Sequence, residues 1–125
     1  QMIRNHCNIM SWNVRGLNAP AKHEAIRETL AALKTAILTL QETKIDTWSS
    51  EITREVGGQL LQGCVVPPAL GTRGGVAIFW NKDVVSIESH SIGRFTITAK
   101  VTELSNNVQY WLTTAYRPTK EGVLS

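Results

Sequence analysis

The strongest constraint on the fold lies in the first third of the chain, where two apolar runs flank a proline-led segment. Asn8 to Val14 is an apolar run without clean alternation, which predicts a strand buried on both faces. Pro20 stands where a first helical turn tolerates proline, with Asn18 nearby as a candidate cap. A second apolar run covers Ala36 to Glu42. Strand, helix and strand in this order predict a βαβ unit with two parallel strands and a right-handed crossover.

Two segments carry helical signals. Between the apolar runs, apolar residues at spacings of four, three and four draw one stripe along a helix: Ile26, Leu30, Leu33 and Ile37. Ser49 to Val56 predicts a second, short helix, because serines stand at its start and Gly57-Gly58 follows its end.

The remainder of the chain predicts strands. Pro67 to Gly75 reads as a loop, and turn signals at Asn81 to Asp83 and at Ser105 to Asn107 separate the later strands. Short connections favour an antiparallel meander, so we expect an α/β domain whose mixed sheet holds one βαβ unit followed by that meander. The expected strands are Gln59 to Val66, Val76 to Trp80, Val85 to Glu88, Phe95 to Thr102 and Val108 to Tyr116.

Composition bounds the class of protein. With 125 residues and 42% hydrophobic content the chain fits one domain with its own core. A net charge of +3 is compatible with a polyanionic partner but does not establish one, since the basic residues are scattered. Cys7 and Cys64 have no metal-binding spacing, so a reduced intracellular compartment, nuclear or cytoplasmic, is favoured over a disulfide scaffold, although one bridge stays compatible with the sequence. No apolar run is long enough to cross a bilayer.

Three polar residues stand at the carboxyl ends of predicted strands, where α/β folds place groups that meet ligands: Asn13, Glu42 and Tyr116. Magnesium commonly takes only one or two protein carboxylates and keeps several waters, so Glu42 could hold it. Asn13 could orient a phosphate oxygen or a metal-bound water through its amide, and Tyr116 could donate its hydroxyl to a phosphate.

Each of these residues also has a structural interpretation. Glu42 could be a solvated loop residue, Asn13 could close a turn before Gly16, and Tyr116 could pack its ring and wet its hydroxyl. For Arg73-Gly74-Gly75 a tight turn is favoured over a phosphate-facing loop. The histidines are expected to be structural or exposed, because none has a carboxylate partner nearby in sequence.

Four ordered segments carry a resemblance to a known family. Met10 to Asn18 resembles the opening motif of the endonuclease/exonuclease/phosphatase (DNase I-like) superfamily, and Leu40 to Lys44 is similar to its second motif. Gly74 to Ile78 and Thr113 to Thr119 resemble the next two. The wording of the first two motifs is most similar to the endonuclease of plant LINE-type retrotransposons.

The resemblance implies roles and a fold. Glu42 would be the Mg²⁺ ligand, Asn13 a hydrogen-bonding neighbour of the metal and the phosphate, and Tyr116 a contact of the scissile phosphate. Lys44 would lie just outside the metal ligands and hold Glu42 in place. Substrate DNA would meet basic side chains within or beside these motifs: Arg15, Lys44 and Arg73. The fold implied is the N-terminal part of a four-layer α/β sandwich, with two sheets face to face and helices outside.

The chain departs from the family pattern in two ways. Arg117 stands where members usually have glycine, and the later Gly-Asp-Phe-Asn and Ser-Asp-His motifs have no counterpart. We therefore expect residues 1–125 to be a single, C-terminally incomplete domain: a fragment of a Mg²⁺-dependent, DNA-nicking phosphodiesterase that is inactive alone. Mg²⁺ belongs to the complete family site, and its binding by this fragment is expected to be weak or absent. The alternative is a non-catalytic remnant that binds nucleic acid or protein, with an exposed apolar sheet face inviting self-association or complementation. Another phosphate ester as substrate also stays open, because phosphatases and sphingomyelinases are related to the family.

Overall fold

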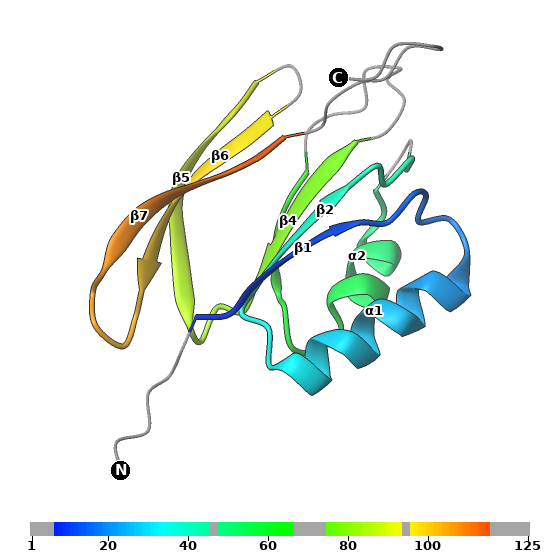
Figure 1. Ribbon diagram of the computed structural model, residues 1–125, viewed down its shortest axis with the longest axis horizontal. Coiled ribbons are helices and arrows are strands. Elements are labelled where there is room, and N and C mark those ends of the chain that lie inside the picture. The colour runs from blue at the N-terminus through cyan, green and yellow to red at the C-terminus, as the bar shows by residue number, and fades with distance from the viewer. Residues whose placement is uncertain (1–6, 46–47, 67–74, 94–95, 116–125) are drawn as a thin grey trace.

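The computed structural model describes residues 7–45, 48–66, 75–93 and 96–115. Within these ranges the chain forms two stacked β-sheets, with helices on the outer face of one of them (Figure 1). The elements, in order, are β1 (Ile9–Asn13), α1 (Pro20–Leu33), β2 (Ile37–Gln41), α2 (Ser50–Gly57), β3 (Gly63–Val65), β4 (Val76–Trp80), β5 (Val85–Ile92), β6 (Thr96–Glu103) and β7 (Gln109–Ala115).

The helix-covered sheet confirms the expected βαβ unit. Its strand order is β1-β2-β4-β3, with β1 parallel to β2 and both β2 and β3 antiparallel to β4. The sheet is therefore mixed, as expected for this α/β fold. β3 is shorter than the expected strand from Gln59 to Val66, because the chain is still turning after α2, where the Leu61 N–H donates to the Gly57 carbonyl at 3.1 Å.

The second sheet is the expected antiparallel meander. Its order is β5-β6-β7, and β6 pairs with β7 from Thr96↔Ala115 to Thr102↔Gln109 without a break. β5 pairs with β6 through a register shift between Ile87 and Ser89, which marks a β-bulge at that point. The meander forms a separate sheet, which the short connections alone did not reveal.

Helix α1 differs from the sequence prediction in its N-cap residue and in the end of its apolar stripe. Pro20 occupies the first turn as expected, but the N-cap is Ala19 and makes no side-chain hydrogen bond. Asn18 is not the cap, because its Nδ2 donates to the Lys44 carbonyl at 3.0 Å. The predicted stripe holds for Ile26 and Leu30, which are buried. It fails at Leu33, which is 52% exposed, and at Ile37, which belongs to β2.

Helix α2 has the cap that its serines predicted. The Ser49 hydroxyl accepts a hydrogen bond from the Ile52 N–H at 3.1 Å, and Gly58 follows as the C-cap. His23 of α1 lies buried between the helices, with Nδ1 2.8 Å from Glu55 Oε1 and Nε2 2.6 Å from the Leu17 carbonyl oxygen. The histidine is structural, as expected, and its carboxylate partner is distant in sequence.

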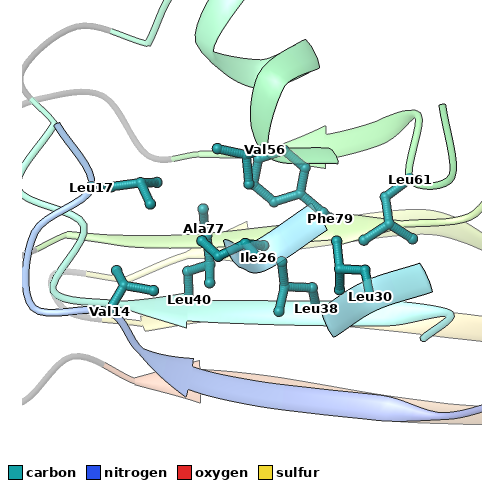
Figure 2. Close-up of a cluster of buried hydrophobic side chains, with 10 residues drawn as sticks. All are labelled: Val14, Leu17, Ile26, Leu30, Leu38, Leu40, Val56, Leu61, Ala77 and Phe79. Carbon is teal, nitrogen blue, oxygen red and sulfur yellow. The ribbon is translucent and has the colours of Figure 1, made fainter. Parts of the chain in front are cut away.

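Two apolar clusters hold the layers together. One fills the space between the helices and the first sheet, and Figure 2 shows its side chains converging from both: Val14, Leu17, Ile26, Leu30, Leu38, Leu40, Val56, Leu61, Ala77 and Phe79. The other lies between the two sheets: Ala36, Ile37, Val76, Ile78, Val85, Ile97, Ala99 and Val101. The inner sheet faces therefore cover each other, and the expectation of an open apolar sheet face is wrong for both of them. The largest exposed aromatic side chain among the described residues is Trp111, at 62%, on β7.

Strand β1 is less buried than its composition predicted. Met10 and Trp12 are half-buried against the helix-side cluster, whereas Ile9, Ser11 and Asn13 are exposed. The prediction of burial on both faces is wrong because β1 is an edge strand of its sheet, so one face and one edge remain open to solvent.

The two cysteines are free, and burial makes the thiol of one of them much less acidic. Cys64 is partly buried, and the loss of hydration raises the pKa of its thiol to about 12. At about pH 8 the thiolate fraction should then fall from about 10% to about 0.01%, and the native thiol should be alkylated roughly 1000-fold more slowly than in urea. Iodoacetamide kinetics on the Cys7→Ser variant check this, because only Cys64 then reacts. Equal native and denatured rates would contradict it.

Candidate metal and phosphate site

The carboxyl ends of β1 and β2 bring the first two candidate residues together. The parallel register pairs Asn13 with Gln41, so Asn13 lies beside the first residue after β2, which is Glu42. Asn13 Nδ2 donates to Glu42 Oε2 at 2.8 Å. This contact joins residues 29 positions apart and follows from the βαβ topology, which places both strand ends at one edge of the sheet.

The orientation of the Asn13 amide is set by the backbone that follows it. The Arg15 N–H donates to Asn13 Oδ1 at 3.2 Å, so the oxygen is engaged and the NH₂ group faces the carboxylate. The Gly16 and Leu17 N–H groups donate to the Glu42 and Thr43 carbonyl oxygens, at 2.7 Å and 2.8 Å. The loop after β1 is thereby bound along the segment after β2.

Unusual backbone conformations are concentrated at this point. Arg15, Glu42 and Lys44 have φ values of 52°, 56° and 56°, in the left-handed region that residues with a Cβ seldom adopt. Such strain persists only where the surroundings over-determine it, and it is found mostly at functional sites. Here the hydrogen bonds between the loop after β1 and the segment after β2 hold these residues in their strained conformations.

Gly75, the residue just before β4, contacts the segment that follows β2. The Thr43 N–H donates to the Gly75 carbonyl at 3.2 Å, and a Cβ on Gly75 would stand 2.8 Å from Thr43 Oγ1. Gly75 has φ +106°, which favours glycine on conformational grounds as well. The final glycine of the Arg73-Gly74-Gly75 motif is therefore required by backbone geometry and by close approach.

Sequence reasoning missed a polar bridge beneath the site. Gln41 Nε2 lies 3.0 Å from Ser11 Oγ, 3.2 Å from Thr39 Oγ1 and 3.0 Å from Thr114 Oγ1. Thr39 and Thr114 are both buried, and Thr114 is the penultimate residue of β7. The bridge fastens the C-terminal end of β7 to the strand that carries Glu42. Its only sequence signal was a glutamine on the inward face of an apolar strand.

Of the basic candidate residues and Tyr116, the structure describes only two. Arg15 and Lys44 are exposed near the strand ends, whereas Tyr116 and Arg73 lie outside the described residues. Within the described part of the chain, Asn13 and not Lys44 is bonded to the Glu42 carboxylate. A Cβ on Gly16 would stand 3.7 Å from Lys44 Cδ, so the lysine stem passes over that glycine.

The sequence profile of the endonuclease/exonuclease/phosphatase family matches residues 10–109, which is most of the chain and includes Asn13 and Glu42. The chain belongs to this family. No curated protein sequence matches it significantly.

Solved structures of the family share the fold. The human Nocturnin catalytic domain aligns with a TM-score of 0.70 at 17% identity, covering 93% of this chain and 51% of its own. An AP endonuclease from Leishmania major aligns at 0.64 and 20% identity, covering 88% and 40%. An AP endonuclease from Archaeoglobus fulgidus aligns at 0.57 and 21% identity, covering 78% and 40%. The chain thus spans about half the length, or less, of the structures that it resembles.

The family setting allows the donor set at the strand ends to be judged. Family members are typically Mg²⁺-dependent. Among the described residues no group of three or more His, Cys, Asp or Glu side chains comes together, and Glu42 supplies the carboxylate bonded to Asn13. A single carboxylate, with waters as the remaining ligands, suits magnesium, whereas zinc takes three or four nitrogen, sulfur or carboxylate ligands. The residues present therefore fit magnesium.

A membrane-spanning helix is also absent from the described residues, where no helix is both long and apolar enough to cross a bilayer.

Proposed function

We propose that this chain carries the metal-binding end of a Mg²⁺-dependent phosphodiesterase site, in a domain that nicks DNA in the manner of LINE-type retrotransposon endonucleases. The observation that carries the proposal is the 2.8 Å hydrogen bond from Asn13 Nδ2 to Glu42 Oε2 at the strand ends. A carboxylate held by an amide at one oxygen keeps its other oxygen free for a cation.

Each residue then has a defined task. Glu42 would hold the ion, and Asn13 would fix the carboxylate rotamer and meet a phosphate oxygen or a metal-bound water. When bound, magnesium polarises the phosphate and stabilises the leaving oxygen. Arg15 and Lys44, both exposed near Asn13 and Glu42, would contact the DNA backbone, as would Arg73, and Tyr116 would donate its hydroxyl to the scissile phosphate.

Three observations support DNA as the substrate of the whole domain. The two AP endonucleases share the fold, the first two motifs have the wording of retrotransposon endonucleases, and the chain has a net charge of +3. A DNA substrate implies a nuclear or cytoplasmic location. Residues 1–125 hold no counterpart of the Gly-Asp-Phe-Asn and Ser-Asp-His motifs, so we propose that they bind Mg²⁺ at most weakly and without turnover. Loss of a general base costs roughly 10²–10⁴-fold in rate.

Magnesium titration of the chain tests the site directly. Amide NMR resonances of Asn13 and Glu42 should shift on addition of Mg²⁺, and Glu42→Gln should weaken that response at least about tenfold, because one carboxylate supplies the charge. Glu88→Gln, which removes an exposed carboxylate on β5, should leave it unchanged. An unchanged Mg²⁺ affinity in Glu42→Gln would remove the metal assignment.

Plasmid nicking tests the absence of turnover. We expect residues 1–125 to leave supercoiled DNA intact in Mg²⁺. EDTA-sensitive nicking that Glu42→Ala abolishes would show instead that the chain is a competent nuclease.

The second candidate is a non-catalytic domain that binds nucleic acid. It is favoured by the finding that no group of three or more His, Cys, Asp or Glu side chains comes together among the described residues. DNA association that weakens with salt and persists in Glu42→Gln would support this candidate over the metal-dependent one.

A further inference from the structure

Lys22, which no sequence motif indicated, is joined to the Glu42 carboxylate by a chain of three hydrogen bonds. Its Nζ donates to the Val14 carbonyl oxygen at 2.8 Å. The Arg15 N–H donates to Asn13 Oδ1 at 3.2 Å, and Asn13 Nδ2 donates to Glu42 Oε2 at 2.8 Å. The peptide between Val14 and Arg15 connects the first of these bonds to the second.

That peptide passes the contact of the lysine on to the Asn13 amide. The Val14 C=O and the Arg15 N–H are the two polar groups of one planar trans peptide, so they point in opposite directions. The ammonium therefore holds one side of the peptide, while the other side holds the amide oxygen. Arg15 has a φ of 52°, and such a conformation persists only where contacts fix it. Loss of the Lys22 bond should tilt the peptide and turn the Asn13 amide with it.

All three bonds donate in the same direction, from a cation to an anion. The ammonium donates to a carbonyl, the N–H of the same peptide donates to an amide oxygen, and the NH₂ group of that amide donates to the carboxylate. Hydrogen bonds aligned in this way polarise one another, and the bonds at the two charged ends are of the stronger type. The chain therefore favours the arrangement in which Asn13 presents its NH₂ group, and not its oxygen, to Glu42.

The position of Lys22 on α1 is unfavourable for the helix itself. The helix begins at Pro20, so Lys22 lies in the first turn, which holds no acidic residue. A cation there meets the positive end of the helix dipole, where an acidic side chain would be stabilising. Lys22 is partly buried, and within the described ranges its ammonium makes no ion pair that would compensate. Its contact with Val14 explains the lysine better than the stability of α1 does.

We propose that Lys22 is a positioning residue of the metal site, which orients the Asn13 amide and, through it, the Glu42 carboxylate. The inference rests on the proposed function, because it concerns the same carboxylate. Lys22 acts through the peptide and the amide and not by contact with the metal or the phosphate. The lysine that supports Glu42 then comes from α1, whereas the family resemblance gave this task to Lys44.

The Asn13 side-chain NH₂ signals of the metal-free protein report on the chain of bonds. Lys22→Met keeps the apolar stem of the lysine and removes the donor. The Asn13 amide proton that meets Glu42 should then resonate upfield and exchange faster with water, because its hydrogen bond is less polarised. In the wild type, an NMR coupling through the hydrogen bond from Lys22 Nζ to the Val14 carbonyl carbon should be detectable. This second measurement needs no variant, so it decides the first link even if Lys22→Met disturbs folding.

Two control variants separate the chain from charge and from loop stability. Lys82→Met removes the same charge just after β4, and the pairing of Trp80 with Ile37 places that turn at the opposite end of the sheet. Asn18→Ala removes another bond between the same two segments, from Asn18 Nδ2 to the Lys44 carbonyl at 3.0 Å, and leaves the chain intact. Both controls should keep the wild-type Asn13 signals.

Magnesium titration distinguishes failure of this inference from failure of the proposed function. Lys22→Met should weaken the Mg²⁺ response of the Glu42 amide at least about threefold, since partners behind metal ligands often contribute tenfold or more, whereas the two controls should not weaken it. A wild type without any Mg²⁺ response would remove the proposed function and leave the Asn13 signals to decide the role of Lys22. Asn13 signals that Lys22→Met moves no more than Asn18→Ala does, or a missing coupling to Val14, would overturn the proposal.

Discussion

Replacing Phe79 by alanine should lower the free energy of unfolding by about 4 kcal/mol, because it empties the centre of the helix-side core. Phe79 is 0% exposed and lies on β4 opposite Leu38 and Cys64 of the neighbouring strands. Its ring packs against Trp48, with centroids 5.9 Å apart and planes tilted by 55°. α2 closes the other side, where a Cβ on Gly57 would stand 3.2 Å from Phe79 Cδ2. Because the paired strands hold Leu38 and Cys64 in place, the cavity cannot collapse readily.

Urea unfolding at a protein concentration that keeps the chain monomeric measures this loss. Trp111→Ala is the control, since it removes a larger aromatic side chain that is 62% exposed and should cost less than about 1 kcal/mol. Small domains are stable by only about 5–15 kcal/mol, so Phe79→Ala should be marginally folded. A loss no greater than that of Trp111→Ala would mean that the helix-side cluster does not hold the fold together.

Local patterns predicted the elements better than they predicted the neighbours of each element. Val76 to Trp80 was recognised as a strand from its run of apolar residues, and it is β4. Its place between β2 and β3 depends on pairings with residues far along the chain, which leave no periodic signal. β1 shows the same limit, because its apolar composition could not tell a central strand from an edge strand with one half-buried face.

The contacts of the candidate site were also only partly predictable from the sequence. The meeting of Asn13 and Glu42 was predictable, since parallel strands joined by a helix end at one edge of the sheet. The Gln41 bridge to Thr114 and the His23 contact with Glu55 were not, because each joins elements whose packing against each other no local sequence pattern predicts. Lys44 was expected to hold Glu42 in place, a role that the resemblance to the family implied. Glu42 and Lys44, the two residues that flank Thr43, both have a left-handed backbone conformation. The side chain that is bonded to the Glu42 carboxylate is that of Asn13.

Gly75→Val should cost about 3 kcal/mol, through two separable effects of adding a side chain at this position. One is conformational, because φ is +106° and a β-branched residue strongly disfavours that region. The other is steric, because the new Cβ would stand 2.8 Å from Thr43 Oγ1, and Thr43 is 1% exposed. Urea unfolding of the variant measures the sum.

Gly16→Val separates the two effects. Gly16 has a similar φ of +99°, but a Cβ there meets only Lys44 Cδ at an ordinary 3.7 Å, so this variant should show the conformational cost alone, about half of the loss at Gly75. The steric part should appear as coupling of at least about 0.5 kcal/mol between Gly75→Val and Thr43→Ala. No such coupling is expected between Gly16→Val and Thr43→Ala. Equal losses at the two glycines, with no coupling to Thr43, would mean that β4 does not press on the segment that carries Glu42. Coupling at Gly75 alone would show that the carboxylate is positioned by contact with a strand that enters the sequence more than thirty residues later.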